Sequence, residues 1–253
     1  AVPERFSKSF AFDNKVESDL YFAMARGAQK EGVDVTAMEM TKWFDTNYHY
    51  IVPEFTKNQN FKISSSKIFD EYLEAKSLGI ETRPVVIGPV SFLLLGKEVD
   101  GSSKLELLDN LLVAYKELFA KLQEIGVKDL QIDEPFLVTD LSLDATKAYE
   151  KAYAKIKEFA GSIKIHLATY FEELGDNANL AFSLNTDSVH VDLVRAPQQL
   201  DKALNAIKDS QTLSIGVING RNIWINNFAN SVEIAGKAVA KLGADRVIVA
   251  PSS

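Results

Sequence analysis

The sequence predicts a (β/α)8 barrel of the TIM type that is incomplete at its N-terminal strands. From Lys67 onward one pattern recurs: an amphipathic helix, a glycine, a short polar link, a β-branched apolar run, and a Pro or Gly that ends the run. Helices that alternate with strands imply a parallel sheet, because parallel strands need crossover connections. No G-x-G-x-x-G follows an early strand, and polar residues follow nearly every strand rather than one switch point. Both observations favour a barrel over an open doubly wound sheet.

The elements follow in order from the N-terminus. Residues Ala1 to about Gly32 are predicted to form a loop and one helix that lead into the first strand. Seven strands are expected near Val35–Phe44, Pro84–Ile87, Leu130–Asp133, Ile163–Thr169, Val189–Val194, Leu213–Ile218 and Val247–Ala250. Several are near-continuous apolar runs, which is typical of strands covered on both faces.

The strongest helix signal runs from Lys104 to Ile125. Its apolar residues recur at helical spacing and form one face, which predicts a helix that covers the sheet. They are Leu105, Leu108, Leu111, Leu112, Tyr115, Leu118, Phe119 and Leu122. Left-handed C-caps are expected where glycines end the helices, at Gly79, Gly126, Gly161 and Gly243.

Composition bounds the class of protein. The 253 residues are 46% hydrophobic and 25% charged, which suits a single domain with a substantial core. The net charge of −7 is spread along the chain, which argues against nucleic acid or an anionic membrane as a partner. No run approaches the roughly 20 apolar residues of a membrane span, and no signal peptide is evident, so a cytoplasmic protein is expected. With no cysteine, disulfides, a thiol nucleophile and Cys-ligated zinc are excluded.

Polar residues at the predicted strand ends are candidate site residues by position. In a barrel, binding and catalytic groups project from the carboxyl ends of the strands into one mouth. The candidates are Lys42, Asp45, Asn47, His49, Gly88, Pro89, Asp133, Glu134, His166, Thr169, Tyr170, His190, Asp192, Arg195, Asn219, Arg221, Asn222, Ser252 and Ser253.

The segment "QIDEP" is the sharpest local motif. Adjacent Asp133 and Glu134 at a strand end point in different directions, so one can face the mouth while the other ties down a neighbouring loop. A general acid/base role in a hydrolase is one interpretation. The other is a structural carboxylate that bonds backbone N–H groups or pairs with Arg83 or Arg221.

Other candidates also leave two interpretations open. His49, His166 and His190 lie near the ends of three strands, but no metal-ligand spacing accompanies them, so no metal site is predicted. Arg221 can hold a ligand carboxylate bidentately or pair with a carboxylate of the protein. Lys42 either extends to solvent or faces an anion in the mouth.

Several motifs in series resemble one known family. Six segments are similar to the N-terminal barrel of cobalamin-independent methionine synthases, and their sequences resemble fungal members most. They are "EMTKWFDTNYHY", "GPVSFLLLGK", "QIDEPFLVTDL", "ATYFEEL", "HVDLVRAP" and "GVINGRNIW". The similarity covers Val33 to Ser253 in order. It implies a barrel of the methionine synthase/uroporphyrinogen decarboxylase type in a methyltransferase with two barrels. The whole enzyme transfers a methyl group from 5-methyltetrahydrofolate polyglutamate to homocysteine, using zinc in its C-terminal barrel.

The resemblance also implies roles for particular residues. The lysine that contacts the folate polyglutamate matches Lys42, and the asparagine of the aromatic loop matches Asn47. The R-E-L-K segment that supplies other tail contacts is not present, and Ala168 stands where the zinc-binding barrel has a cysteine. We therefore expect a piece of the N-terminal barrel that has no catalytic residue, metal or cofactor of its own and is inactive alone. Its expected partners are the folate and the zinc-bearing C-terminal barrel, and exposed sheet edges predict self-association.

Overall fold

A computed structural model describes residues 2–10, 16–30 and 32–253. Its centre is a parallel sheet in which the strands lie in chain order, β6-β8-β9-β10-β11-β12. The strands are β6 (Val85–Ile87), β8 (Asp129–Asp133), β9 (Lys164–Ala168), β10 (Ser188–Asp192), β11 (Thr212–Ile218) and β12 (Val247–Pro251). An order without reversal differs from that of a doubly wound sheet. Among the described residues β6 and β12 do not pair with each other, so the sheet is open and closure into the predicted barrel is not confirmed.

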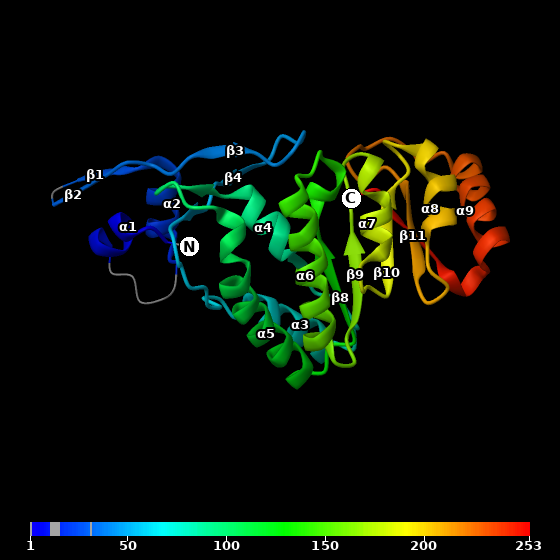
Figure 1. Ribbon diagram of the computed structural model, residues 1–253, viewed down its shortest axis with the longest axis horizontal. Helices are drawn as coiled ribbons and strands as arrows, with labels where there is room; N and C mark the ends of the chain where they lie inside the picture. The colour runs from blue at the N-terminus through cyan, green and yellow to red at the C-terminus, as the bar shows by residue number, and fades with distance from the viewer. Residues whose placement is uncertain (1, 11–15, 31) are drawn as a thin grey trace.

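Helices cover one face of this sheet (Figure 1), and neighbouring helices such as α5 and α6, or α8 and α9, contact each other. They are α4 (Pro89–Leu95), α5 (Leu108–Glu124), α6 (Leu143–Ala160), α7 (Ala178–Ser183), α8 (Leu200–Ala206) and α9 (Phe228–Leu242). Short 3-10 turns precede or follow them at η1 (Lys104–Leu107), η2 (Pro135–Val138), η3 (Gly175–Asn177), η4 (Pro197–Gln199) and η5 (Ala244–Arg246). The predicted helix from Lys104 to Ile125 is confirmed as η1 followed by α5. No helix in the described part of the chain is long and apolar enough to cross a membrane.

The alternation of side chains along the strands gives the sheet two unlike faces. Leu130 and Ile132 of β8, like Val189 and Val191 of β10, are fully buried beneath the helices. Residues of opposite parity are polar on most strands and point to the other face: Gln131, Asp133, His166, Ser188, His190 and Ser214. Since successive residues of a strand point to opposite faces, one short sequence builds both the core and a polar wall.

The four predicted glycine caps are confirmed. Gly79, Gly126, Gly161 and Gly243 all have positive φ, between 57° and 87°. At Gly126 the backbone N–H bonds to the Gln123 carbonyl at 3.0 Å as α5 ends. This conformation lets the chain turn directly from the helix into β8.

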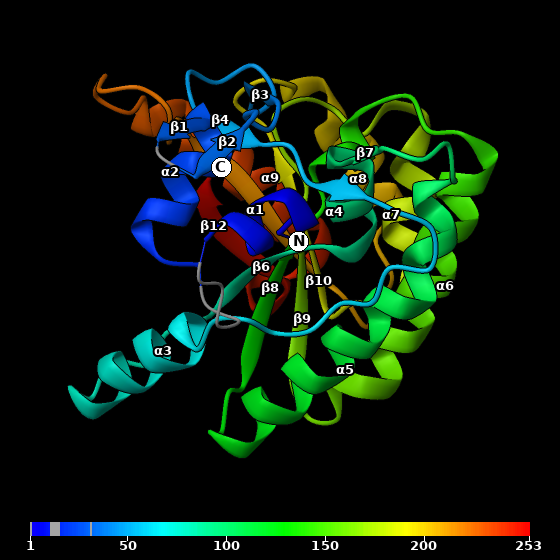
Figure 2. The same ribbon diagram turned by 90° about the vertical axis from the view of Figure 1, so that its left-hand side faces the viewer.

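The N-terminal part differs from the prediction. The described residues of this part, 2–10, 16–30 and 32–35, form two helices and two paired strands rather than one helix: α1 (Glu4–Ser9), α2 (Ser18–Arg26), β1 (Ala28–Lys30) and β2 (Val33–Val35). They enclose a small separate core that contains Phe6, Leu20 and Met24. Ala1 and residues 11–15 and 31 lie outside the described residues. This part lies at one end of the molecule (Figure 1), and Figure 2 looks onto that end, with α3 (Lys67–Ser77) below it.

The predicted strand Val35–Phe44 is wrong. Apart from Val35, which ends β2, only β3 (Met40–Lys42) forms there, and it pairs antiparallel with β4 (His49–Ile51), so that Lys42 is the register partner of His49. All three residues of β3 are exposed, whereas a barrel strand is buried. The polar residues after Lys42 turn the chain back into a hairpin instead of leading to a helix. The chain then runs through β5 (Glu54–Phe55), which pairs with β7 (Lys97–Glu98).

Candidate functional site

The polar face of the sheet and the loop between β3 and β4 enclose the main candidate cavity. Its volume is about 710 Å³. The sheet contributes Gln131, Asp133, His166, Ser188, His190 and Ser214, and the loop contributes Trp43, Thr46, Asn47 and Tyr48. The site therefore combines two segments far apart in sequence, and lies where the barrel prediction placed the candidate mouth.

Two histidines of the cavity wall are held by neighbouring strands. His166 contacts Ser188 Oγ through Nδ1 and Asp129 Oδ1 through Nε2, both at 2.6 Å. In His190, Nδ1 contacts Ser214 Oγ at 2.9 Å and Nε2 donates to the Ser252 carbonyl at 3.1 Å. Burial lowers the pKa of both rings, although Asp129 opposes this at His166. All four ring nitrogens have protein partners, so these histidines act as structural groups that brace adjacent strands.

The two carboxylates of "QIDEP" point to opposite sides of the sheet, as predicted. Asp133 faces the cavity and accepts hydrogen bonds from Tyr170 Oη at 2.5 Å and Gln131 Nε2 at 2.8 Å. Burial raises its pKa, and these two hydrogen bonds oppose that rise. The hydrolase interpretation needs both carboxylates in one space, and this geometry does not provide it.

Glu134 is fully buried on the helix side of the sheet. Its Oε2 accepts the Ser91 backbone N–H at 2.8 Å, and Tyr153 Oη donates to its Oε1 at 3.3 Å. Burial raises the pKa of Glu134 to about 7, against these hydrogen bonds. The predicted pairing of either carboxylate with Arg83 or Arg221 is absent among the described ion pairs. The structural interpretation, a carboxylate that bonds backbone N–H groups, is the correct one for Glu134.

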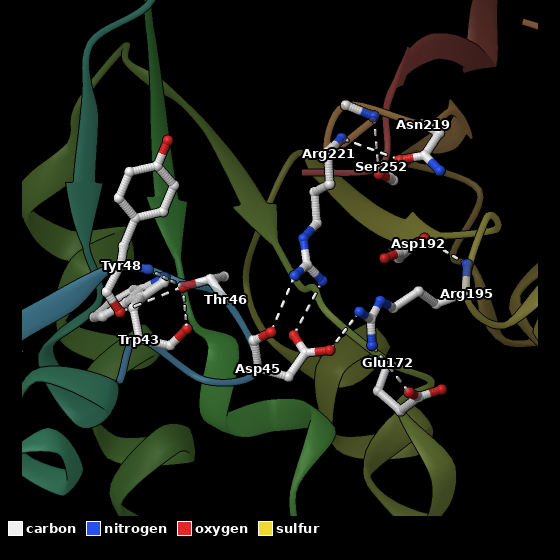
Figure 3. A network of polar contacts seen from close by, with 11 residues as sticks. Trp43, Asp45, Thr46, Tyr48, Glu172, Asp192, Arg195, Asn219, Arg221 and Ser252 are labelled. Atoms are coloured by element: carbon white, nitrogen blue, oxygen red, sulfur yellow. Dashed lines mark hydrogen bonds and ion pairs between the residues drawn. The ribbon is translucent and has the colours of Figure 1, made fainter. Parts of the chain in front are cut away.

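An ion-pair network joins the β3–β4 loop to the ends of β10 and β11 (Figure 3). Asp45 Oδ2 pairs with Arg195, and Asp45 Oδ1 accepts a hydrogen bond from Arg221 Nη1 at 3.0 Å. Arg221 Nη2 also donates to the Asp45 carbonyl at 3.1 Å. Arg195 Nη1 lies 3.9 Å from Glu172. Arg221 thus pairs with a carboxylate of the protein, but one that lies 176 positions away.

The two residues assigned by resemblance lie on this same hairpin. Asn47 is exposed and lines the cavity. Lys42 is exposed on β3, outside the cavity lining, and its ammonium group has no ion pair or hydrogen bond among the described residues. The hairpin therefore carries an amide that lines the cavity and an exposed cation outside the cavity lining.

The other candidates have structural contacts or lie exposed at the rim. Gly88 and Pro89 begin α4, and Thr169 Oγ1 donates to the His190 carbonyl at 2.7 Å. Asn219 Oδ1 accepts the Arg221 backbone N–H at 3.0 Å, while Asn222 and His49 are exposed. Ser252 is buried and Ser253 lines the cavity. Tyr170 donates to Asp133, and Asp192 Oδ1 accepts the backbone N–H groups of Val194 and Arg195 at 2.9 Å.

Sequence reasoning did not find that Asp45 brings two arginines together. Arg195 and Arg221 follow different strands, and their partner comes from a hairpin that the pattern suggested was a strand. No local spacing marks such a cluster. Only the strand order, which places the ends of β10 and β11 side by side, could have suggested that the two arginines are neighbours.

The family profile described as "Cobalamin-independent synthase, N-terminal domain" matches residues 1–243. The chain belongs to this family. The match confirms the resemblance recognised from the motifs and extends it to the N-terminal residues before Val33.

Curated relatives of this N-terminal domain family are much longer than the chain. The 5-methyltetrahydropteroyltriglutamate–homocysteine methyltransferase of Cytophaga hutchinsonii is 50% identical over 255 residues, which cover 99% of this chain and 33% of the relative. The protein of the same name from Saccharomyces cerevisiae is 49% identical over 261 residues, covering 100% of this chain and 34% of the relative. The chain spans about a third of these relatives, and the identities do not separate fungal from bacterial members.

Solved structures of B12-independent methionine synthases share the fold. A Shewanella methionine synthase in complex with selenomethionine matches with a TM-score of 0.63 at 14% identity, over 85% of this chain and 66% of that chain. A putative vitamin-B12 independent methionine synthase from Listeria monocytogenes matches at 0.60 and 18%, over 79% and 65%. At these identities the likeness concerns the fold alone, an α/β architecture with a parallel sheet.

The residues of this N-terminal domain do not fit a zinc site. Both ring nitrogens of His166 are bonded within the protein, and Ala168, two residues along the same strand, has no ligating atom. No group of three or more His, Cys, Asp or Glu side chains in the described part of the chain could hold a metal ion. The side chains of this cavity can hydrogen-bond and pair with charge, but they do not supply a metal's ligands.

Proposed function

We propose that this chain is the N-terminal barrel of a cobalamin-independent methionine synthase. The whole protein would transfer a methyl group from 5-methyltetrahydrofolate polyglutamate to homocysteine. The family match and the printed names of relatives about 50% identical support this proposal. The zinc and the thiolate chemistry would belong to a second barrel in the remaining two thirds of such a protein, so this domain alone would not catalyse methyl transfer.

The structural contribution of this domain would be to brace the second barrel and to bind the folate's glutamate tail. The open edges of the sheet at β6 and β12 leave room for further strands that would close the barrel. We place the protein in the cytoplasm, with no nucleic-acid or membrane partner. The same open edges would let the chain self-associate when the rest of the protein is lacking.

The single observation that supports tail binding is that the β3–β4 hairpin carries both an exposed lysine and an asparagine that lines the cavity. The Lys42 ammonium has no protein partner among the described residues, and the Asn47 amide lines the adjacent cavity. A chain of γ-glutamyl carboxylates needs cations and N–H donors, and both are presented there. Lys42 would bind a tail carboxylate, while Asn47 would donate a hydrogen bond to another.

The test compares 5-methyltetrahydropteroyltriglutamate with its monoglutamate. We expect Lys42→Ala to weaken binding of the triglutamate about tenfold, as loss of one charge-assisted hydrogen bond would. Binding of the monoglutamate should change little, because it lacks the outer carboxylates. Lys147→Ala on the exposed face of α6 is the matched control and should leave both affinities unchanged. Equal effects of the two lysine variants, measured by calorimetry, would refute the assignment of Lys42.

A further inference from the structure

The carboxylate of Asp45 sits between two arginines in the manner of a bound ligand. One of its oxygens pairs with Arg195 and the other with Arg221 Nη1 at 3.0 Å, so each oxygen faces a different guanidinium. Figure 3 shows the three side chains converging from separate segments. Two guanidinium groups that converge on one carboxylate form a site for a carboxylate, whatever molecule carries it.

Contacts other than those with Asp45 also hold the segments that carry the two arginines. The backbone N–H groups of Val194 and Arg195 both donate to Asp192 Oδ1 at 2.9 Å, which fixes the turn after β10. The Arg221 guanidinium lies over the Phe171 ring, 5.1 Å from its centroid. These contacts fix the turn that carries Arg195 and support the Arg221 side chain, so both arginines would still extend from the ends of neighbouring strands if Asp45 left.

The Asp45 contacts are open to competition. The side chain of Asp45 is 48% exposed, against 33% for Arg195 and 26% for Arg221. Ion pairs exposed to this degree add little stability, because water and salt screen them. An external molecule with several carboxylates can therefore replace Asp45 at the arginines.

We propose that Arg195 and Arg221 form a carboxylate-binding site whose resident occupant is Asp45, and that a carboxylate of a γ-glutamyl chain displaces Asp45 and releases the loop of residues 43–48. The choice of a γ-glutamyl ligand rests on the proposed function, whereas the arginine site itself does not. The loop lines the cavity through Trp43, Thr46 and Asn47, so its release would reshape the cavity mouth. Binding at the arginines would thereby be coupled to the position of Asn47.

Trp43 reports on this loop. The sequence has two tryptophans, and the other, Trp224, is 75% exposed and can be replaced by phenylalanine to leave Trp43 as the only indole. In this Trp224→Phe background, Trp43 emission is followed during titration with tri-γ-glutamate, which has no pteridine ring. Urea unfolding of each variant verifies that it is folded.

Asp45→Asn is expected to bind tri-γ-glutamate about five- to tenfold more tightly, because the site no longer has to be vacated first. Arg195→Gln should abolish binding. Glu172→Gln is the matched control, because it also removes one negative charge near Arg195. Glu172 lies 3.9 Å from Arg195 and does not sit between the two arginines, so the affinity of this variant should stay within about twofold.

Two results would overturn the inference. An equal gain in Glu172→Gln and Asp45→Asn would mean that general charge, not displacement, controls binding. Unchanged or weaker binding by Asp45→Asn would mean that Asp45 does not occupy a ligand site. Failure of Lys42→Ala to affect the folate would refute the proposed tail contact but leave this result intact, so the two proposals fail separately.

Discussion

Replacing the buried Glu134 with glutamine is expected to remove a pH-dependent loss of stability. The side chain is fully buried, and burial raises its pKa from the ordinary value of 4.5 to about 7. Between these two values the folded protein keeps the proton while the unfolded chain loses it. Folding is therefore linked to protonation of this one carboxyl group.

The sign and the size follow from this linkage. Below pH 4.5 Glu134 is protonated in both states, and the stability is at its full value. As the pH rises toward about 7, ionisation of the unfolded chain alone lowers the free energy of unfolding, and above that pH the loss is complete. One pKa unit corresponds to about 1.4 kcal/mol, so the total loss is roughly 3 kcal/mol.

A glutamine at this position has nearly the same shape and cannot ionise. Its carbonyl can accept the Ser91 N–H that Glu134 accepts at 2.8 Å, and its amide can donate to the Tyr153 hydroxyl. Urea unfolding from about pH 5 to 8 gives the free energy of unfolding of each protein. Relative to Glu134→Gln, the wild-type protein should lose roughly 2.5 kcal/mol over this range, because part of the total loss has already occurred at pH 5. Contributions from other titrating groups cancel in the difference.

The control is Glu150→Gln, an exposed position on α6. Its stability should follow the wild-type curve at every pH. If the curves of Glu134→Gln and the wild-type protein run parallel instead, Glu134 does not take up a proton on folding, and the reasoning from its burial is wrong.

Two pairs of substitutions test the packing. An ideal Cβ at Gly88 would lie 2.0 Å from Glu134 Cδ, so Gly88→Ala should destabilise the protein by roughly 1–3 kcal/mol. A Cβ at Gly236 in α9 would have no atom within 4 Å, so Gly236→Ala should stabilise the protein by roughly 0.5–1 kcal/mol. The opposite signs are measurable as shifts of the urea midpoint, and a shared sign would contradict the contact. Phe119→Ala in α5 should cost roughly 3–5 kcal/mol because the ring is fully buried, whereas Val113→Ala, 66% exposed on the same helix, should change stability by less than about 0.5 kcal/mol. Similar losses from both would show that α5 does not pack by the face described.

The parallel sheet could be predicted because its signals are local. Each strand is a short β-branched run that follows a glycine-capped helix, and the Leu and Phe spacing in α5 specifies which face is buried. The polar alternation in "DLQID" likewise places Asp133 opposite to Ile132 and Glu134. These features depend on side-chain period alone, which a single sequence carries.

The hairpin could not be predicted in the same way. Residues 35–44 have a strand-like pattern, and pairing with either a parallel or an antiparallel neighbour satisfies such a pattern equally. What decides the outcome is the return of the chain at residues 43–48, where the Trp43 carbonyl accepts hydrogen bonds from the Thr46 backbone N–H at 3.1 Å and from Thr46 Oγ1 at 2.7 Å. Local sequence patterns also cannot predict the ion pairs of Asp45, because 176 positions separate Asp45 from Arg221.

The hairpin that carries Lys42 and Asn47 has little stability of its own. An isolated two-stranded hairpin is marginal in water, and every residue of β3 is exposed. Its position is supported by Tyr50 of β4, whose Oη donates to the Leu95 carbonyl at 3.0 Å, and by its loop, where Phe44 packs against Phe136 and Phe171 and Asp45 binds the two arginines. The geometry of the candidate binding residues therefore depends on side chains that follow β8, β9, β10 and β11 and that need not touch the ligand. Substitutions at Phe136 or Phe171 should accordingly alter binding at the rim through the loop, even though the tail contacts proposed for Lys42 and Asn47 are made elsewhere.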